Sequence, residues 1–471
     1  VCTRTTAFFR APLMHCKARP HTPAHNACSF FAPMAHPLMH MHSDVLIVGA
    51  GPAGLSLAIS LAKAGFTATV LDQNPTAALE QPAPDGREIA LTHPSVATLQ
   101  RLGSWAGLAA SEMGHIRAAH VHDGPVGAHS AMQLQAAHGA GAAPAPSMPL
   151  GFIVPNHALR RTAYGVAAST PGVRIVPGAQ VHRVATLPTH AEVDYTDAAA
   201  PGQASQRLCA PLVVAADSRF SAARRQLGIG AQMTDFGRTV IVCRMRHTEP
   251  HADTAHECFG YERTLAVLPL PDDDAGHPQC SVVVTAQAAD AARLMALEPT
   301  AFTAEVQAQF QHRLGDMELI EQRHAYPLVA VYAQRFTGPR CALLGDAAVG
   351  MHPVTAHGYN LGLAGVERLT QALEAARQRG QDLGDAAALA PYARAHHLHA
   401  WPIYQGTNAI VRLYTDARPL PRLLRQAVLQ GARHLPPLKA AIVGQLTGKT
   451  PAWQTPLARL GTALAAARPG R

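Results

Sequence analysis

The segment from residue 43 to residue 75, SDVLIVGAGPAGLSLAISLAKAGFTATVLDQNP, constrains the fold more than any other part of the chain. It begins with the apolar run Val45–Val48, which predicts a buried parallel strand. A glycine-rich turn and a helical pattern follow, and a second apolar run, Thr67–Leu71, ends at Asp72. The glycines of the turn are Gly49, Gly51 and Gly54. This order predicts a β-α-β unit of the dinucleotide-binding type.

Each part of this unit suits a ligand that carries phosphate. Gly49 allows the tight turn out of the strand, Gly51 lets the backbone approach a pyrophosphate, and Gly54 lets the helix pack closely on the sheet. The N–H groups and the positive dipole end of the helix N-terminus bind phosphate. Asp72, eighteen positions after Gly54, can accept hydrogen bonds from an adenosine ribose. These residues alone do not distinguish FAD from NAD.

The composition indicates an ordinary globular protein. The 471 residues are 48% hydrophobic and 15% charged, which is enough for two or three domains with a large core. The net charge of +8 comes from the two ends, because residues 1–43 and 401–471 are basic and nearly free of acids. The balanced centre argues against a nucleic-acid-binding protein. Eight cysteines without paired spacing indicate a reducing compartment, so a cytoplasmic location is expected.

Residues 1–42 differ from the rest of the chain and are expected to be a disordered or artefactual extension. They contain scattered cysteine, histidine and proline without any period, and residues 1–38 are expected to contribute nothing to catalysis. Four of them could ligate zinc in principle, namely Cys16, His21, His25 and Cys28. No zinc-finger hairpin or helix is predicted around them, and no metal site is expected in the chain.

Two later apolar runs end in aspartates, as the first unit does. Pro211–Ala216 leads to Asp217, and Cys341–Leu344 leads to Asp346. Between them, three runs rich in β-branched residues predict an antiparallel sheet and a second domain. These runs are Thr239–Arg246, Leu265–Leu270 and Cys280–Ala286. Residues 125–150 are rich in Ala, Gly and Pro and predict a loop.

Three motifs in this order resemble those of the single-component flavin aromatic hydroxylases, which are class A flavoprotein monooxygenases. G-A-G-P-A-G with Asp72 is similar to their first motif, and A-D-S-R-F-S with Arg224 is similar to their second. The run from Gly345 to Gly362 is similar to their third. The resemblance covers residues 43–450 and implies that the cofactor is FAD.

Within that superfamily, the chain resembles the FAD-dependent hydroxylases of ubiquinone biosynthesis. The resemblance is carried by G-R-E-I-A-L, by Y-P-L at Tyr326–Leu328 and by N-L-G-L at Asn360–Leu363. Ser218 stands where most members have Gly, and Val349 and His357 replace the usual His and Gln. With these residues, the second and third motifs are similar to those of the UbiM branch.

The resemblance implies an α/β fold in which a glutathione-reductase-type, Rossmann-like FAD domain is interleaved with a mixed or antiparallel substrate sheet. C-terminal helices complete it. The expected segments are an N-terminal extension at 1–42, a first FAD-binding part at 43–235 that substrate-domain segments interrupt, a substrate-binding sheet domain at 236–339, a second FAD-binding part at 340–375 and a C-terminal helical region at 376–471.

The resemblance also implies site residues. Those expected to bind the cofactor are Gly49, Gly51, Gly54, Asp72, Arg87, Asn156, Asp217, Asp346, Gly358 and Asn360. Asp346 can bind ribityl hydroxyls or be a plain helix cap, and Arg87 can neutralise phosphate or be simply solvated. The helix that starts near Gly358 can stabilise the anionic reduced flavin with its N–H groups and dipole. His357 and Pro353 are the candidate catalytic residues, with a structural histidine as the alternative for His357.

The activity implied by the resemblance is monooxygenation of a prenylated phenol of ubiquinone biosynthesis, such as 5-hydroxylation of demethoxyubiquinol. It would proceed through a flavin hydroperoxide formed from O₂, with NAD(P)H as electron donor. No second dinucleotide fingerprint is present, so NAD(P)H would dock transiently. One alternative is a hydroxylase of a small aromatic acid, whose carboxylate Arg244, Arg246 or Tyr261 would hold. Another is a non-catalytic FAD-binding scaffold of a quinone-biosynthesis complex.

A basic segment near the C-terminus predicts contact with the membrane surface, where a prenylated substrate resides. Its apolar residues are Leu423, Leu424, Ala427 and Val428, beside Arg418, Arg422, Arg425 and Arg433. A helix packed on the FAD domain is the alternative. No transmembrane helix is predicted, because the glycines interrupt the long apolar run of residues 45–61. The expected location is cytoplasmic or peripheral on the inner membrane, with the partners of a ubiquinone-biosynthesis complex and no nucleic acid.

Overall fold

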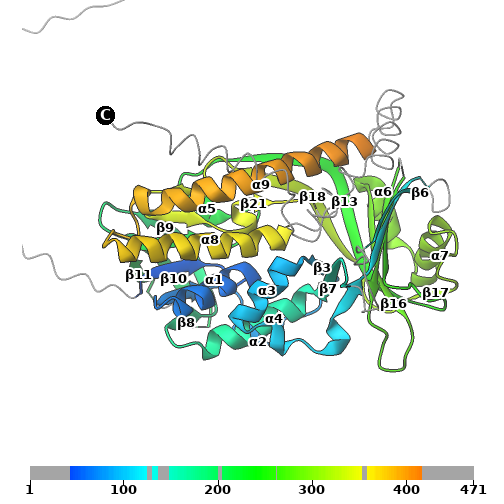
Figure 1. The fold of residues 1–471 in the computed structure, drawn as a ribbon, viewed down its shortest axis with the longest axis horizontal. Coiled ribbons are helices and arrows are strands. Elements are labelled where there is room, and N and C mark those ends of the chain that lie inside the picture. The colour runs from blue at the N-terminus through cyan, green and yellow to red at the C-terminus, as the bar shows by residue number, and fades with distance from the viewer. Residues whose placement is uncertain are drawn as a thin grey trace, which may run out of the picture. The chain divides into compact units, whose positions relative to one another are not determined.

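A six-stranded sheet forms the core of the nucleotide-binding part (Figure 1). The computed structural model describes residues 43–124, 130–135, 148–199, 204–260, 262–352 and 358–415, all within one compact unit. The strand order is β19-β20-β12-β1-β2-β8, and each neighbouring pair is parallel except β19 with β20. The strands are β1 (Val45–Val48), β2 (Ala68–Leu71), β8 (Val173–Val176), β12 (Leu212–Ala215), β19 (Thr337–Gly338) and β20 (Cys341–Leu343).

Parallel pairing explains why the three sequence motifs meet. β1 has β2 on one side and β12 on the other, and β12 is followed by β20. The carboxyl ends of parallel strands lie at one edge of a sheet, and ligands of open α/β sheets bind at that edge. The residues after these strands, Gly49, Asp72, Asp217 and Gly345, therefore lie along one edge.

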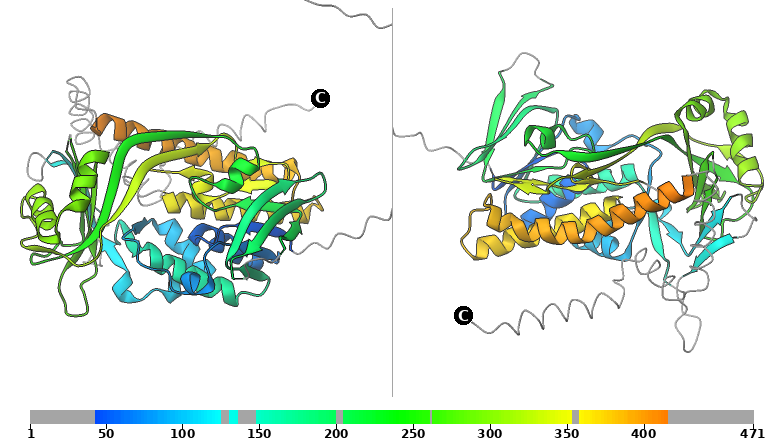
Figure 2. Two further views of the ribbon diagram at one scale, coloured as in Figure 1. Left: turned by 180° about the vertical axis from the view of Figure 1, so that it is seen from behind. Right: turned by 90° about the horizontal axis from the view of Figure 1, so that it is seen from above.

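Helices cover this sheet and are joined to each other by side-chain hydrogen bonds. The principal ones are α1 (Pro52–Lys63), α4 (Asn156–Ser169), α8 (Gly358–Gln378) and α9 (Ala386–Thr415). The Ser60 hydroxyl of α1 lies 2.9 Å from that of Thr370 in α8, and α8 and α9 run side by side (Figures 1 and 2). The Tyr392 hydroxyl of α9 donates to the Leu343 carbonyl of β20 at 2.5 Å, so α9 is fixed to the sheet.

A nine-stranded sheet forms the second part, in the order β21-β18-β13-β16-β15-β14-β5-β6, with β17 beside β13. All pairs are antiparallel except β14 with β5. Its strands are β5 (Ala118–Asp123), β6 (Ser130–Gln135), β13 (Ala231–His247), β14 (Thr254–Phe259), β15 (Thr264–Leu270), β16 (Gln279–Gln287), β17 (Met317–Leu319), β18 (His324–Ala333) and β21 (Val349–Gly350).

Strand β13 runs from the edge of the six-stranded sheet where the motifs meet into the second sheet, to which it belongs (Figure 2). It has 17 residues, of which 231–235 and 239–242 pair with β18, and the register shifts between Asp235 and Thr239. Gly237, between them, has a φ of +62°, a conformation that favours glycine and lets the strand bend. β18 also pairs with β21, which belongs to the third motif. The bent pair β13–β18 therefore places the second sheet next to that motif.

The shorter elements complete the described structure. Two three-stranded sheets are present, with orders β3-β7-β4 and β11-β10-β9. Their strands are β3 (Glu88–Leu91), β4 (Gly114–Ile116), β7 (Gly151–Pro155), β9 (Ala179–Thr186), β10 (Ala191–Asp197) and β11 (Gln206–Ala210). The remaining helices are α2 (Thr76–Glu80), α3 (His93–Leu102), α5 (Ala222–Gln226), α6 (Ala288–Ala296), α7 (Pro299–Gln309) and the 3₁₀ turns η1 (Trp105–Gly107), η2 (Ala110–Glu112) and η3 (Gly345–Ala347).

The predicted α/β fold with an interleaved antiparallel sheet is confirmed, and one local prediction is wrong. Part of the loop expected at residues 125–150 is strand β6, which pairs with β5. Leu134 is buried and Gln133 is exposed, so a short alternation was hidden by the Ala- and Gly-rich flanks. No helix within the described ranges is long and apolar enough to cross a membrane. The extension at 1–42 and the basic segment at 418–433 lie outside the described residues, and the segment boundaries remain predictions.

Candidate active site

The glycine-rich turn leaves open space where the sequence predicts a pyrophosphate. Gly49 has a φ of +112°, and a Cβ there would lie 2.6 Å from the Ala216 carbonyl oxygen. A Cβ on Gly54 would lie 2.1 Å from the Gly49 carbonyl oxygen. Both positions therefore require glycine for the fold itself. A Cβ on Gly51 would meet no atom within 4 Å, so this glycine opens a space at the N-terminus of α1.

Asp72 lies at the side of this turn. One carboxylate oxygen accepts from the Ala50 N–H at 2.6 Å, and the other accepts from the backbone and side-chain N–H groups of Asn74 at 2.8 Å. The carboxylate thus holds the turn to the end of β2. Asp72 is half-buried, and its role toward an adenosine ribose remains a prediction.

The second motif is built around Asp217 and the N-terminus of α5. The Asp217 carboxylate accepts from the Ser221 hydroxyl at 2.5 Å and from the Ala223 N–H at 3.3 Å. Ser221 caps α5 by accepting from the Arg224 N–H at 2.8 Å. This network positions Asp217, but it also occupies both carboxylate oxygens within the protein.

Arg224 and Arg219 join the second motif to the third. The buried Arg224 guanidinium donates to the carbonyls of Arg219 at 3.2 Å and Ala347 at 2.9 Å. Arg219 donates to Asp346 at 3.1 Å and to the Val329 carbonyl of β18 at 3.1 Å. The Asp346 side chain stays 39% exposed at the edge of the sheet, so it can also accept from a ligand.

Asp85 brings together Arg87 and Asn156, two residues predicted to bind the cofactor. Its carboxylate accepts from Arg87 at 2.5 Å and from the Asn156 amide at 2.8 Å, and its backbone carbonyl accepts from the Tyr326 hydroxyl at 2.7 Å. Burial works against the charged form, but Arg87 and Asn156 outweigh it and hold the pKa of Asp85 below its ordinary value. Asp85 is not among the residues predicted from the sequence, although the turn signal Asp-Gly directly precedes Arg87.

Of the site residues predicted around the start of α8, Gly358 and Asn360 lie within the described part of the chain. Asn360 is buried; its side-chain oxygen accepts from the Thr92 N–H at 3.0 Å, and its amide donates to the Ala90 carbonyl at 2.9 Å. Its side chain therefore holds β3 to α8, while the first N–H groups of α8, from Gly358 onward, remain the predicted flavin contacts. Pro353 and His357, the candidate catalytic residues, lie outside the described residues.

Glu88 is a second residue of the site that was not predicted from the sequence. It lies on β3 and faces Arg244 on β13 of the nine-stranded sheet. The Glu88 side chain is 2% exposed, and one of its oxygens accepts from Arg244 at 2.7 and 2.8 Å. Its second oxygen is buried without a hydrogen-bond partner in the described structure. Burial raises the pKa of Glu88 to about 7, although Arg244 opposes the shift. Nothing in the spacing of the sequence indicates that these two residues meet.

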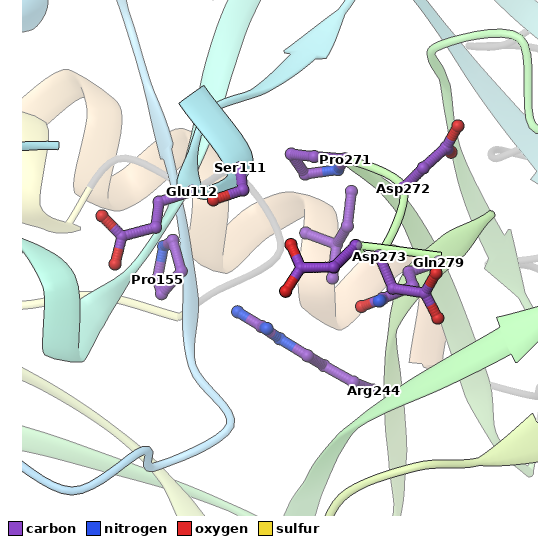
Figure 3. Close-up of a pocket in the computed structure, with 10 residues that line it drawn as sticks. Ser111, Glu112, Pro155, Arg244, Pro271, Asp272, Asp273 and Gln279 are labelled. Atoms are coloured by element: carbon purple, nitrogen blue, oxygen red, sulfur yellow. The ribbon is translucent and has the colours of Figure 1, made fainter. Parts of the chain in front are cut away.

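A small polar cavity of about 190 Å³ lies beside this pair. Figure 3 shows the Arg244 side chain extending into it between Pro155 and Asp273. The acids that line it are Glu112, Asp272, Asp273 and Asp274. Arg244 is paired with Glu88 and lies 3.5 Å from Glu321. Arg246, two residues further along β13, is paired with Asp273 at 3.0 Å and Glu318 at 3.3 Å.

An apolar patch on β13 and β18 lies between Gly86 and His352. It consists of Val240, Val242 and Leu328, with Phe236, Val283 and Tyr326 packed against them. Gly86 approaches Val242 so closely that a Cβ would lie 2.9 Å from its methyl group, and His352 packs edge-on to Phe236 at 5.3 Å. Burial and two arginines lower the pKa of His352 to about 3, so its ring is neutral. The patch therefore provides neutral, apolar surroundings beside the predicted flavin residues.

The elevated pKa of Glu88 predicts a pH-dependent contribution to stability. The folded protein binds this proton more tightly than the unfolded chain, whose carboxyl has a pKa of 4.5, so stability from this group falls as pH rises from 4.5 to about 7. Glu88→Gln removes the charge. The stability of this variant relative to the wild type should improve by about 2.5 kcal/mol between about pH 5 and about pH 8.

Urea unfolding at the two pH values measures this difference. The exposed Glu318, also beside an arginine, supplies the control Glu318→Gln, because an ion pair in solvent contributes little to stability. An equal difference between variant and wild type at both pH values would show that the Glu88 proton is not bound differently in the folded state.

Comparison with known proteins identifies relatives of this chain. The model of the family described as FAD binding domain matches residues 42–407. The chain is 44% identical to the ubiquinone hydroxylase UbiM of Neisseria meningitidis, over 87% of this chain and 86% of that protein. It is 31% identical to the ubiquinone hydroxylase UbiL of Rhodospirillum rubrum, over 86% and 90% of the two chains.

Solved structures share the fold. The p-nitrophenol 4-monooxygenase PnpA from Pseudomonas putida superposes with a TM-score of 0.69 at 18% identity, over 87% of this chain and 99% of that chain. The protein pqsL, a probable FAD-dependent monooxygenase from Pseudomonas aeruginosa, superposes with a TM-score of 0.63 at 20% identity, over 82% of this chain and 99% of that chain. At these identities the likeness concerns the fold alone.

Proposed function

The chain belongs to the FAD binding domain family, and from this premise we propose that it is an FAD-dependent monooxygenase that hydroxylates the ring of a prenylated phenol in ubiquinone biosynthesis. The observation that carries the proposal is the 44% identity with the ubiquinone hydroxylase UbiM of Neisseria meningitidis over most of both chains. FAD supplies the redox chemistry and the activation of O₂ when it is bound.

The residues present fit FAD. The open space over Gly51 accommodates a pyrophosphate at the N-terminus of α1, where N–H groups and the helix dipole favour anions. Asp72 and Asp346 lie at the same sheet edge, where they would accept hydrogen bonds from ribose and ribityl hydroxyls. Arg87, held by Asp85, adds a positive charge near Asp346. These residues would bind and orient the cofactor.

The charge arrangement on the second sheet favours a phenol over an aromatic acid. A carboxylate substrate needs an arginine that is free to bind it. Arg244 and Arg246 already have carboxylate partners, and the cavity beside them is lined with acids. Tyr261, the third candidate for a carboxylate clamp, lies outside the described residues. The apolar patch of Val240, Val242 and Leu328 suits an uncharged ring and tail and would help to exclude water from the reacting centre.

We extend the proposal to the electron donor and the place of work. NAD(P)H is proposed as the donor, docking transiently, because the chain has no second dinucleotide fingerprint. Peripheral binding to the inner membrane is proposed because the substrate class is lipid-soluble and the chain ends in a basic amphipathic pattern. Association with other enzymes of ubiquinone biosynthesis belongs to the same proposal.

The deciding experiment is genetic and chemical. The chain is expressed in a bacterium that lacks its own ring hydroxylases, and quinones are measured by mass spectrometry. Restored ubiquinone, with part of the enzyme in the membrane fraction at low salt, is the expected result. Accumulated intermediates will identify the ring carbon. Well-expressed, flavin-loaded protein that restores no ubiquinone but oxidises NAD(P)H on a soluble hydroxybenzoate would favour the aromatic-acid alternative.

A further inference from the structure

Three histidines converge on the second sheet, away from the candidate active site. His120 and His122 lie two residues apart on β5, and His256 lies on the neighbouring strand β14, directly opposite His120 in the parallel register. One ring nitrogen from each lies within 4.8 Å of the other two. Nε2 of His122 and Nδ1 of His256 are 3.1 Å apart.

Pairing across the strands places this cluster on the face that is opposite the apolar patch. His256 pairs with Val267, Val267 with Val282, and Val282 with Cys243, and directly paired residues share a face. That face packs under α6 and α7, where Phe310 lies edge-on to His256 at 5.3 Å. Val240 and Val242 alternate with Cys243 and point to the other side.

The geometry matches a metal site with nitrogen ligands. A tetrahedral zinc ion with zinc–nitrogen bonds of about 2.0–2.1 Å places its ligand nitrogens about 3.3–3.4 Å apart. The 3.1 Å spacing of His122 and His256 is close to this value, and small side-chain movements bring in His120. Two histidines at alternate positions of one strand and a third on the next strand present three rings to one point.

The protonation state of the cluster is also suitable. Burial, with Arg313 and the neighbouring rings, lowers the pKa of His122 to about 4 and that of His256 to about 3. The rings are therefore neutral near pH 7, and neutral imidazole is the form that binds metal. The buried His122 is only 3% exposed, and its Nδ1 has no hydrogen-bond partner in the described structure. Arg313, the cation that acts on all three rings, weakens the attraction for a metal ion but leaves its bonding geometry available.

We propose that His120, His122 and His256 bind one divalent transition-metal ion, with zinc the best match to three imidazole ligands. His120 is half-buried, so a fourth position is accessible to water. The ion would join β5 to β14, the one parallel pair of the nine-stranded sheet, and so tie the chain segment between β4 and β7 to the second sheet. Its role is structural, because the cluster faces away from the candidate active site. The proposal replaces the expectation that the chain has no metal site.

The test uses the full, FAD-bound chain, treated with a chelator, reloaded with zinc ions and separated from free metal. Metal content is measured by mass spectrometry, and melting temperature is measured with and without zinc. Wild type should retain one equivalent more zinc than His256→Gln, and zinc should raise the melting temperature of the wild type but not that of His256→Gln. His182→Gln is the control, because His182 is an exposed strand histidine that pairs with Thr196 outside the cluster.

The control should behave as the wild type, and any zinc bound elsewhere is common to all variants. Flavin content shows whether His256→Gln has folded. If it has not, His120→Gln replaces the least buried member of the cluster and should lose the same equivalent. Equal zinc content in wild type and a folded cluster variant, or no zinc retained by the wild type, would overturn the proposal.

Discussion

Gly51→Val is expected to give a folded protein that contains almost no FAD. A Cβ at this position meets no atom of the protein within 4 Å, and Gly51 has an ordinary φ of −67°, so the fold has no reason to change. The same side chain would occupy the space through which a pyrophosphate approaches the backbone. We expect FAD affinity to fall at least about 100-fold, which corresponds to about 2.7 kcal/mol. The flavin-to-protein absorbance ratio and circular dichroism measure the two effects separately.

Two other glycines make this experiment specific. Gly165 is an exposed position of α4 where a Cβ also meets no atom within 4 Å, so Gly165→Val should keep a full flavin content. Gly54→Val should instead damage the fold, because its Cβ would lie 2.1 Å from the Gly49 carbonyl oxygen. A Gly51→Val protein with a full flavin spectrum would show that the cofactor does not bind over this turn.

Arg224→Met should cause the largest loss of stability among the arginine substitutions of the second motif. The variant keeps a long side chain but leaves the carbonyls of Arg219 and Ala347 without their charged donor. Removing a buried, charged hydrogen-bonding partner costs about 3 kcal/mol. Because Arg224 joins the second and third motifs, FAD affinity should fall together with the melting temperature, which we expect to drop by about 3 °C. Thermal unfolding of the flavin-free protein measures the stability term alone.

The neighbouring Arg225 provides a matched control. It is exposed and, within the described part of the chain, donates to the Phe220 carbonyl of its own motif alone, so Arg225→Met should change stability by less than about 0.5 kcal/mol. Equal melting temperatures for the Arg224 and Arg225 variants would mean that the link between the two motifs carries no stability of its own.

Sequence patterns predict this protein best where structure depends on neighbours along the chain. The first β-α-β unit, the buried strands that lead to Asp217 and Asp346, and the β-branched strands around residues 239–286 are all present. Each is encoded by a short pattern of apolar residues and glycines whose period reports the local backbone. The prediction failed at strand β6, where the informative stretch was too short to stand out from its Ala- and Gly-rich surroundings.

Several interactions of the site could not be predicted in this way. Asp85 accepts from Tyr326 across 241 residues of sequence, and Glu88 faces Arg244 across 156. Neither pair leaves a local pattern, because the partners are brought together by the bent pair β13–β18 and the small β3 sheet. The buried Glu88 is recognisable as unusual only after its surroundings are known.

The sequence by itself determined the nucleotide-binding unit and the family to which the chain belongs, because glycines at required spacings and short buried strands act within about thirty residues. Only the tertiary structure decided which distant side chains meet. His120 and His122 form an ordinary alternating pair in the sequence, and His256 lies more than 130 residues later; their convergence depends on the parallel register of β5 and β14. The physical reason is that strand register, which hydrogen bonding and core packing over a whole sheet determine, cannot be read from any one segment.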